Sequence, residues 1–255
     1  MSDTDSSQDP WIGFEQEYTL FKGNTPLGWP ENGYPAPQGP FYCGVGADET
    51  FGREMVQDHL EACLDANLML FGINAEVMPG QWEFQVGYRG IAEESADPIT
   101  VSDHLWVARW LLYRIGEEYG ITATLDPKPV KGDWNGAGKH TNFSTAPMRN
   151  AETGKQTIDS AITALSRSHE QHISVYGHGL AERLTGQHET AHISQFRAGV
   201  SDRGAAIRIP QSVAEKGYGY IEDRRPGANA DPYEVAAALV KTICHATTKI
   251  SETAR

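Results

Sequence analysis

The sequence predicts an α+β fold, in which a curved, mainly antiparallel sheet has helices packed on its outside. Two observations support this class. Strand-like segments and helical segments come in separate groups, without the regular strand–helix alternation that predicts a parallel sheet. The sequence also has no internal repeat. The 255 residues suffice for one large domain with an ample core. We expect residues 1–10, "MSDTDSSQDP", to be a disordered polar tail and residues 11–255 to form that domain.

In the first half of the chain, apolar periodicity predicts a strand, a helix, a hairpin and a second helix. The second helix is expected to be capped by Ser102 or Asp103 and to stop at Gly120. A long Gly/Pro-rich connection precedes the first helix, and connections of that length are usually functional or tightly packed. In order, the segments are the strand 11–21, the connection 23–46, the helix 50–67, the hairpin strands 68–77 and 82–87, the polar loop 90–103 and the helix 102–119.

The second half ends in a helix whose start is marked by Asp231 and Pro232, an N-cap followed by proline at the first helical position. The stretch "LTGQHETAHIS" is expected to be a loop, because Gly186 interrupts it and it has no helical apolar stripe. The remaining segments are extended residues 121–130, a Gly-rich turn entering a strand over 132–144, a helix over 157–175, and strands over 204–213 and 217–226.

Composition excludes several classes of protein. The chain has 34 acidic and 21 basic side chains, a formal net charge of -13, which argues against a nucleic-acid partner because phosphate binding needs a positive surface. Its three cysteines are far apart and odd in number, so they predict neither a disulfide framework nor a zinc site. No apolar run is long enough to cross a membrane, and the polar start is unlike a signal peptide. We therefore expect a cytoplasmic protein with no membrane partner.

The hairpin raises the first question about function. If "NAEVMPGQWEF" folds symmetrically about Pro79 and Gly80, Glu76 lies directly opposite Glu83. Two carboxylates in that position are roughly 5 Å apart and repel each other. Either both side chains point into water, or a cation lies between them. The bulky apolar neighbours suggest a buried hairpin, where unpartnered carboxylates are costly.

Further acidic residues lie on extended segments. Glu15 and Glu17 share one face of the first strand, a pattern that alone is more typical of a half-solvated strand. Glu222 shares a face with Arg224, and a same-face salt bridge is the simplest explanation. His140 follows two glycines that let the backbone approach a ligand. Five glutamates with one histidine suit Mg²⁺ or Mn²⁺ better than zinc, and such sites commonly clamp phosphate oxygens.

Arginines are clustered as well. Arg208 lies between two isoleucines on an otherwise apolar segment, where a guanidinium needs an anion. A phosphate group would meet that need, and so would an internal salt bridge to one of the glutamates. Acid-bound cations faced by arginines would form a phosphoryl-transfer site.

The motifs together resemble a known family. "GFEQEYTL", "NAEVMPGQWEFQVG", "DHLWVARWLLYR", "DPKP", "WNGAGKHTNFST", "RLTGQHET", "IRIP" and "GYGYIEDRRPGANADPY" resemble, in the same order, the catalytic domain of glutamine synthetase in its eukaryotic-type branch. The resemblance runs from about residue 10 to about residue 242. It implies the sheet described above, a catalytic fold similar to that of guanido kinases, so that fold alone does not identify the nucleophile.

The resemblance also implies a reaction and its residues. ATP phosphorylates the γ-carboxylate of glutamate, and ammonia displaces phosphate to give glutamine, with two or more Mg²⁺ or Mn²⁺ ions per site. The implied metal ligands are Glu17, Glu76 and Glu83 for one ion and Glu15, His140 and Glu222 for the other. The implied glutamate-binding residues are Asn135, Gly136, Arg183 and Arg224. The implied catalytic residues are Arg203 and Arg208 at the phosphoryl group and Glu189 as the proton acceptor. The residues implied to lie near the nucleotide are Trp11, Asn142, Ser144 and Tyr220.

Two departures from the family pattern leave alternatives open. The family carries a smaller β-grasp domain before this segment, which contributes to the neighbour's ammonia site, and here only ten polar residues stand there. In addition, Lys139 precedes the histidine where the family has a smaller or less charged residue. The chain could act with a homo-oligomeric neighbour or a β-grasp partner chain, join another amine to glutamate, or be a catalytically silent partner protein.

Overall fold

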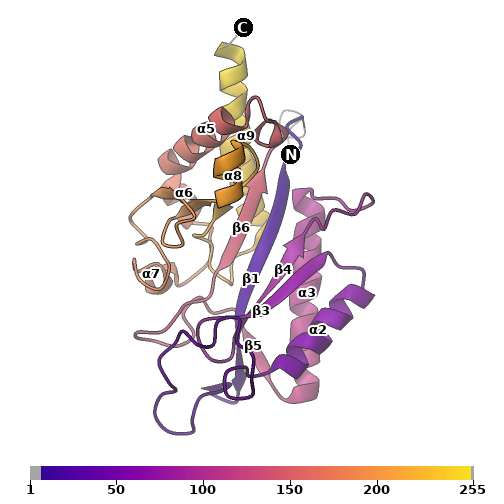
Figure 1. Ribbon diagram of the computed structural model, residues 1–255, viewed down its shortest axis with the longest axis vertical. Coiled ribbons are helices and arrows are strands. Elements are labelled where there is room, and N and C mark those ends of the chain that lie inside the picture. The colour runs from indigo at the N-terminus through magenta and orange to yellow at the C-terminus, as the bar shows by residue number, and fades with distance from the viewer. Residues whose placement is uncertain (1–6, 254–255) are drawn as a thin grey trace.

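The computed structural model describes residues 7–253, with side chains described up to residue 244. Within this range nine strands form one sheet in the order β3-β4-β1-β6-β9-β8-β7, with β2 and β5 also paired to β1 (Figure 1). Only β7 and β8 pair in parallel among the described strands. The predicted α+β class with a mainly antiparallel sheet is confirmed. The strands are β1 (Trp11–Lys22), β2 (Thr25–Pro26), β3 (Leu70–Ala75), β4 (Gln81–Gly87), β5 (Thr122–Thr124), β6 (Lys139–Ser144), β7 (Ala198–Val200), β8 (Ile207–Ile209) and β9 (Ile221–Asp223).

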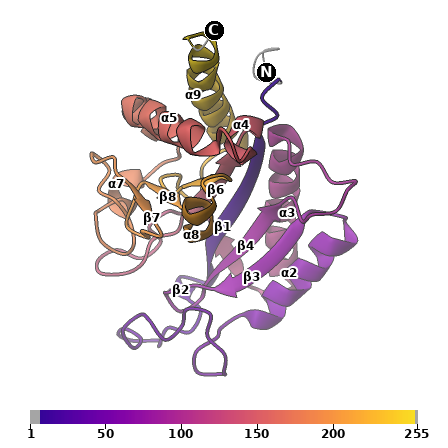
Figure 2. The same cartoon turned by 45° about the horizontal axis from the view of Figure 1, so that its top comes forward.

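The longer helices α2, α3 and α9 cover one face of this sheet. Figures 1 and 2 show α3 running beside β1 and β4, with α2 next to it and α9 beyond β6. The predicted helices over 50–67 and from Asp231-Pro232 correspond to α2 and α9. No described helix is long and apolar enough to cross a membrane. The helices are α2 (Arg53–Asp65), α3 (Pro98–Tyr119), α4 (Ala146–Arg149), α5 (Gly154–Arg167), α6 (His169–Ile173), α7 (Leu180–Arg183), α8 (Gln211–Lys216) and α9 (Pro232–Thr253).

Strand β1 separates the core from the opposite face of the sheet. Phe14, Tyr18 and Leu20 are fully buried on the helix side. Gln16, on that same side, accepts two hydrogen bonds from the guanidinium of Arg109 on α3. Because side chains alternate along a strand, Glu15 and Glu17 project from the face away from the helices. The alternation along this strand therefore places its apolar side chains in the core and its glutamates on the opposite face of the sheet.

Helix α3 begins four residues earlier than the sequence predicted. The N-cap is Asp97, with Pro98 at the first helical position, rather than Ser102 or Asp103. The Asp97 carboxylate accepts hydrogen bonds from the N–H groups of Ile99 and Thr100, both at 3.0 Å. The Asp-Pro pair is the same start signal that correctly placed α9, but here it lay inside a polar stretch.

Removing this cap should destabilise the protein modestly. We expect Asp97→Ala to lower the free energy of unfolding by about 1 kcal/mol, because two N–H groups lose their acceptor. Denaturant unfolding followed by circular dichroism would measure it. Asp97→Asn should recover most of the loss, since asparagine caps nearly as well; equal losses for both variants would contradict the capping role.

The predicted hairpin register is wrong by two residues. The residue opposite Glu83 is Asn74, and Ala75 lies opposite Trp82, so Glu76 is beyond the last pair. A shift of two keeps every side chain on its original face because the strand period is two. Glu76 therefore still points to the same side as Glu83.

The register differs because the turn is centred between Met78 and Pro79, one residue earlier than predicted. The Glu76 N–H donates to the Gln81 carbonyl at 2.8 Å, and the Gln81 N–H donates to the Met78 carbonyl at 3.0 Å. Gly80 has a φ of 76° and packs against residue 27, where a Cβ would come within 2.6 Å of a carbonyl oxygen. Only glycine satisfies both conditions, so tertiary packing sets the turn.

Several other predicted segments are shorter or divided. The extended segment 121–130 is a strand only at β5, since prolines follow it, and the predicted helix 157–175 is split into α5 and α6 at Ser168. The predicted strand 204–213 stops at Pro210, which has no N–H to donate, and α8 begins there. The predicted strand 217–226 is reduced to β9.

The predicted tail falls partly outside the described residues. Residues 1–6 lie outside them, whereas residues 7–10 pack on the domain. The Gln8 side chain donates to the Cys244 carbonyl at 2.9 Å, and the Gln8 carbonyl accepts from the Ala146 N–H at 2.8 Å. Asp9 forms an ion pair with Arg149 at 2.6 Å. The end of the predicted tail is thus attached, and the domain boundaries stay a prediction.

Candidate active site

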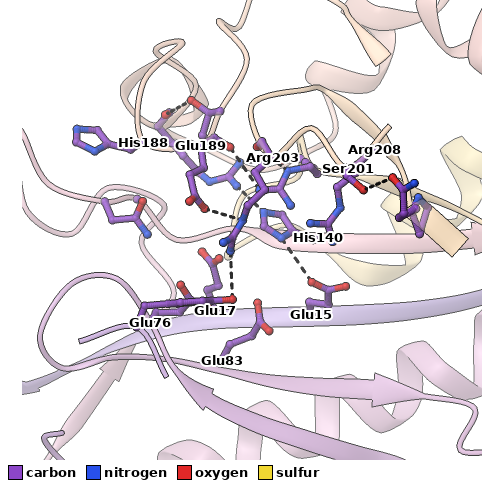
Figure 3. A pocket seen from close by; sticks show the side chains of 18 residues that line it. Glu15, Glu17, Glu76, Glu83, His140, His188, Glu189, Ser201, Arg203 and Arg208 are labelled. Atoms are coloured by element: carbon purple, nitrogen blue, oxygen red, sulfur yellow. Dashed lines mark hydrogen bonds and ion pairs between the residues drawn. The ribbon is translucent and has the colours of Figure 1, made fainter. Parts of the chain in front are cut away.

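A polar cavity of about 420 Å³ opens on the sheet face away from α2, α3 and α9. Figure 3 shows glutamates pointing into it from the strands, opposite arginines and a histidine. Predicted residues that line it are Glu15, Glu17, Glu76, Glu83, Asn135, Gly136, His140, Arg183, Glu189, Arg203, Arg208 and Arg224.

Cross-strand pairing brings these residues together from distant parts of the chain. Glu17 on β1 lies directly opposite Glu83 on β4, and Glu15 lies opposite His140 on β6. On the other side of β6, Glu222 on β9 lies opposite Arg208 on β8. The close acidic pair that the hairpin suggested is therefore Glu17 with Glu83, and Glu76 joins it from the turn.

The acidic side chains form two overlapping groups. In one, oxygen atoms of Glu17, Glu76 and Glu83 all lie within 4.8 Å of one another, and the second group joins Glu15, Glu83 and His140 within the same limit. The first group is the predicted one. The second contains Glu83 in the place predicted for Glu222.

Burial makes this cluster electrostatically unfavourable without a cation. Desolvation raises the pKa of Glu17 to about 7, although Arg183 and the Gly138 N–H oppose the shift. Desolvation and the charge of Glu17 raise the pKa of Glu76 well above its usual range. Desolvation and the charge of Glu15 do the same for Glu83. The raised pKa values favour the protonated carboxyls, and a divalent cation would displace those protons.

Glu222 is occupied by arginines instead. Its carboxylate is fully buried, pairs with Arg224 at 2.6 Å and forms a further close ion pair with Arg208. Its Oε1 atom is also 3.4 Å from Nδ1 of His140. Both alternatives that the sequence left open for these residues, the Glu222–Arg224 salt bridge and an internal partner for Arg208, are present.

His140 is a neutral imidazole in this setting. Burial, together with the charge of Arg224, holds its pKa well below the usual range. Arg183 can only donate, so the His140 Nε2 atom 3.2 Å away accepts, and the ring proton is on Nδ1 facing Glu222. A neutral ring is the form that binds cations, although a cation at Nδ1 would first have to displace that proton.

The wall opposite the acids is built around Arg183 and Arg224. Arg183 is fixed by the main-chain carbonyls of residues 224 and 225, at 3.2 and 3.3 Å. Gly136 packs against Arg183 so closely that a Cβ would approach its Cγ to 2.8 Å. Asn135 donates from its side chain to Gln81 at 3.2 Å. The predicted glutamate-binding residues thus form one wall.

Glu189 reaches the cavity from a strained loop. Its φ is 61° and that of His188 is 50°, both in the left-handed region that costs non-glycine residues about 1 kcal/mol or more. The Glu189 carboxylate pairs with Arg203 at 3.2 Å, and its carbonyl accepts from Arg224 at 3.4 Å.

Sequence reasoning missed the residues that the Gly/Pro-rich connection contributes. Tyr42 lines the cavity, and its hydroxyl accepts a hydrogen bond from Arg203 at 3.2 Å. Gln38 contacts both His188 and the main chain of Asn135. The length of the connection was the only signal, and it did not single out a residue.

The predicted nucleotide residues lie in a second, more apolar cavity of about 370 Å³. Trp11, Asn142, Ser144 and Tyr220 all line it. Asn142 links the two cavities, because its side-chain amide donates to Glu15 at 2.8 Å. The arrangement offers an aromatic and apolar pocket joined to an acidic one.

Comparison with known proteins adds independent findings. A family model described as the catalytic domain of glutamine synthetase matches residues 1–249. Glutamine synthetase from Streptomyces viridochromogenes is 56% identical over 252 residues, covering 97% of this chain and 70% of that protein. Glutamine synthetase from Xenopus laevis is 56% identical over 238 residues, covering 91% and 59%. A chloroplastic glutamine synthetase from Chlamydomonas reinhardtii is 53% identical over 246 residues, covering 95% and 63%.

The solved structures show the same fold. A structure described as apo GmaS without ligand has a TM-score of 0.72 and 18% sequence identity, covering 96% of this chain and 56% of that one. The chain thus spans between 59% and 70% of the length of these curated relatives.

Proposed function

The chain belongs to the glutamine synthetase catalytic-domain family, and from that premise we propose that it carries the active site of an ATP-dependent glutamate–ammonia ligase. The observation that supports this most directly is the main cavity. Buried carboxylates with raised pKa values face guanidinium groups across a space that adjoins an aromatic pocket. Acids to hold cations and arginines to hold phosphate are what phosphoryl transfer to a carboxylate requires.

The donor set fits a hard divalent cation such as Mg²⁺ or Mn²⁺. Glu17, Glu76 and Glu83 would hold one ion, and Glu15 and His140 the other, with Glu83 within reach of both. Glu222 would become a ligand only by giving up an arginine. A bound cation supplies positive charge against the phosphate oxygens as negative charge develops there.

The protein's own residues account for the remaining chemistry. Arg183 and Arg224 bind the carboxylate groups of glutamate, while Arg203 and Arg208 donate hydrogen bonds to the transferring phosphoryl group. The γ-carboxylate oxygen attacks the γ-phosphorus of ATP and ADP leaves. Ammonia then attacks the acyl carbon, inorganic phosphate leaves, and Glu189 takes the surplus proton. The loop that carries Glu189 excludes water from the acyl phosphate.

The nucleotide would enter the second cavity. Trp11 and Tyr220 offer ring faces to a base, and Ser144 and Asn142 offer polar groups. Because Asn142 contacts Glu15, the base pocket and the cation site are held in a fixed position relative to each other.

The proposal predicts glutamate-dependent phosphate release from ATP by the purified protein with Mg²⁺ or Mn²⁺. Reactions would contain ammonium, a panel of small amines, or neither, and glutamine would be measured alongside phosphate. Stimulation by ammonium with glutamine formed supports the ligase. Stimulation only by another amine would identify that amine, in place of ammonia, as the substrate. Phosphate release that does not depend on glutamate would overturn the proposal.

The protein can also bind ATP and cations without catalysing the reaction. If ATP and cations bind without turnover, a further domain or a neighbouring subunit must complete the ammonia site, as the greater length of the relatives allows. We infer that such a β-grasp domain, on this protein or a partner, belongs to the active assembly.

A further inference from the structure

Three loops meet at the mouth of the main cavity, and His188 lies where they touch. Its Nε2 atom is 2.9 Å from Oδ1 of Asp133, in the loop that precedes β6. Its Nδ1 atom is 3.0 Å from the side-chain nitrogen of Gln38, in the Gly/Pro-rich connection. One imidazole therefore ties the Glu189 loop to two other segments that are distant in sequence.

The direction of each hydrogen bond is determined by Gln38. Its Oε1 atom accepts from the main-chain N–H of Asn135 at 2.9 Å, so its NH₂ group must face His188. Nδ1 of His188 can then only accept, and the ring proton is on Nε2, from which it is donated to Asp133. Every donor in the series Asn135–Gln38–His188–Asp133 meets an acceptor. Reversing the Gln38 amide or the His188 tautomer would place two donors together.

This series connects two proposed functional groups. At one end the Asn135 side chain lies in the glutamate wall. Within the series, His188 precedes Glu189, and both residues have a positive φ, a conformation that persists only where neighbouring contacts hold it. His188 is the first of that pair, so its two hydrogen bonds hold the peptide that aims Glu189 at Arg203.

We propose that His188 and Gln38 are positioning residues that lock the Glu189 loop to the glutamate wall as one unit. This inference rests on the proposed function for its catalytic consequence. With the unit intact, the loop shields the acyl phosphate until ammonia arrives. With it broken, water replaces ammonia as the nucleophile, and ATP is hydrolysed to ADP and phosphate while glutamate is regenerated.

The catalytic test uses His188→Ala, Gln38→Met and the double variant in the full chain. We expect each single variant to raise the ratio of ATP hydrolysed to glutamine formed about fivefold, the effect of losing roughly 1 kcal/mol of hydrogen bonding. The double variant should be scarcely worse than either single one, because both break the same unit. His188→Asn keeps an acceptor near the Nδ1 position and should recover part of the coupling. His178→Ala, at an exposed histidine outside the cavity, is the matched control.

A second measurement does not depend on activity. Hydrogen exchange without substrates would compare the peptides that cover residues 133–138 and 185–192. His188→Ala should speed exchange in both peptides, although Asn135 is far from residue 188 in sequence. Faster exchange in the 185–192 peptide alone, or additive effects in the double variant, would overturn the inference. Phosphate release that does not depend on glutamate in the wild-type protein would instead count against the proposed function, and the exchange result would still decide the coupling.

Discussion

Replacing Glu83 with glutamine is expected to reduce glutamate-dependent turnover by about a thousandfold while making the cation-free protein more stable. The carboxylate belongs to both acidic groups, so its loss weakens both proposed cation sites, and several kcal/mol of charge stabilisation would be lost from the phosphoryl-transfer step. Stability should rise because burying this carboxyl requires either desolvation of its charge or uptake of a proton, and glutamine avoids both. Steady-state kinetics and denaturant unfolding in a chelator would measure the two effects.

The opposite signs make this result decisive. A purely structural carboxylate would lose activity and stability together. Glu93→Gln, which removes a similar charge from an exposed loop, serves as the matched control and should change neither quantity. Retention of turnover in Glu83→Gln would rule out the proposed cation site.

The second large effect is a dependence of cation-free stability on pH. The pKa of Glu17 is raised to about 7 in the folded protein, and those of Glu76 and Glu83 are raised well above 4.5. The folded state thus binds protons at these carboxyls that the unfolded state releases, so their contribution to stability is greatest at low pH and is lost as pH rises through the folded values. A pKa that differs by one between the folded and unfolded states corresponds to about 1.4 kcal/mol, so the loss between pH 6.5 and 8.5 should be on the order of 2 kcal/mol.

Mg²⁺ or Mn²⁺ should reverse this loss. Cations bind the deprotonated carboxylates, so the stabilisation they give should be larger at pH 8.5 than at pH 6.5. This window avoids the buried histidines His59 and His172, whose lowered pKa values of about 4 leave them neutral throughout. Thermal unfolding with and without chelator measures the effect, with NaCl at matched ionic strength as the control. Equal stabilisation at both pH values would contradict it.

Local patterns predicted those parts of the fold that local chemistry controls. The alternation in β1 placed its acids on one face, and Asp231-Pro232 marked the start of α9, because strand periodicity and helix capping depend on a few adjacent residues. The position of the turn before Gln81 could not be predicted in this way. Its geometry is set by the contact of Gly80 with residue 27, which no local pattern contains.

The same limit applies to the candidate site. Residue types and family motifs indicated the acids, His140 and the arginines, and all of the predicted site residues of these types except Glu222 line one cavity. The pairing of Glu17 with Glu83, the engagement of Glu222 by arginines and the contributions of Gln38 and Tyr42 depend on which strands and loops become neighbours. Those neighbours are far apart in sequence, so spacing carried no information about them.

The pairing of distant strands also determines when the site can form during folding. Glu15 meets His140, and Glu17 meets Glu83, only after β1 has been flanked by both β6 and β4. Such non-local contacts form late and slowly, because closing the long loops between them costs conformational entropy first. A divalent cation therefore finds no high-affinity site on the nascent chain and cannot template its folding. It would act afterwards, by slowing the unfolding of molecules whose central sheet is already complete.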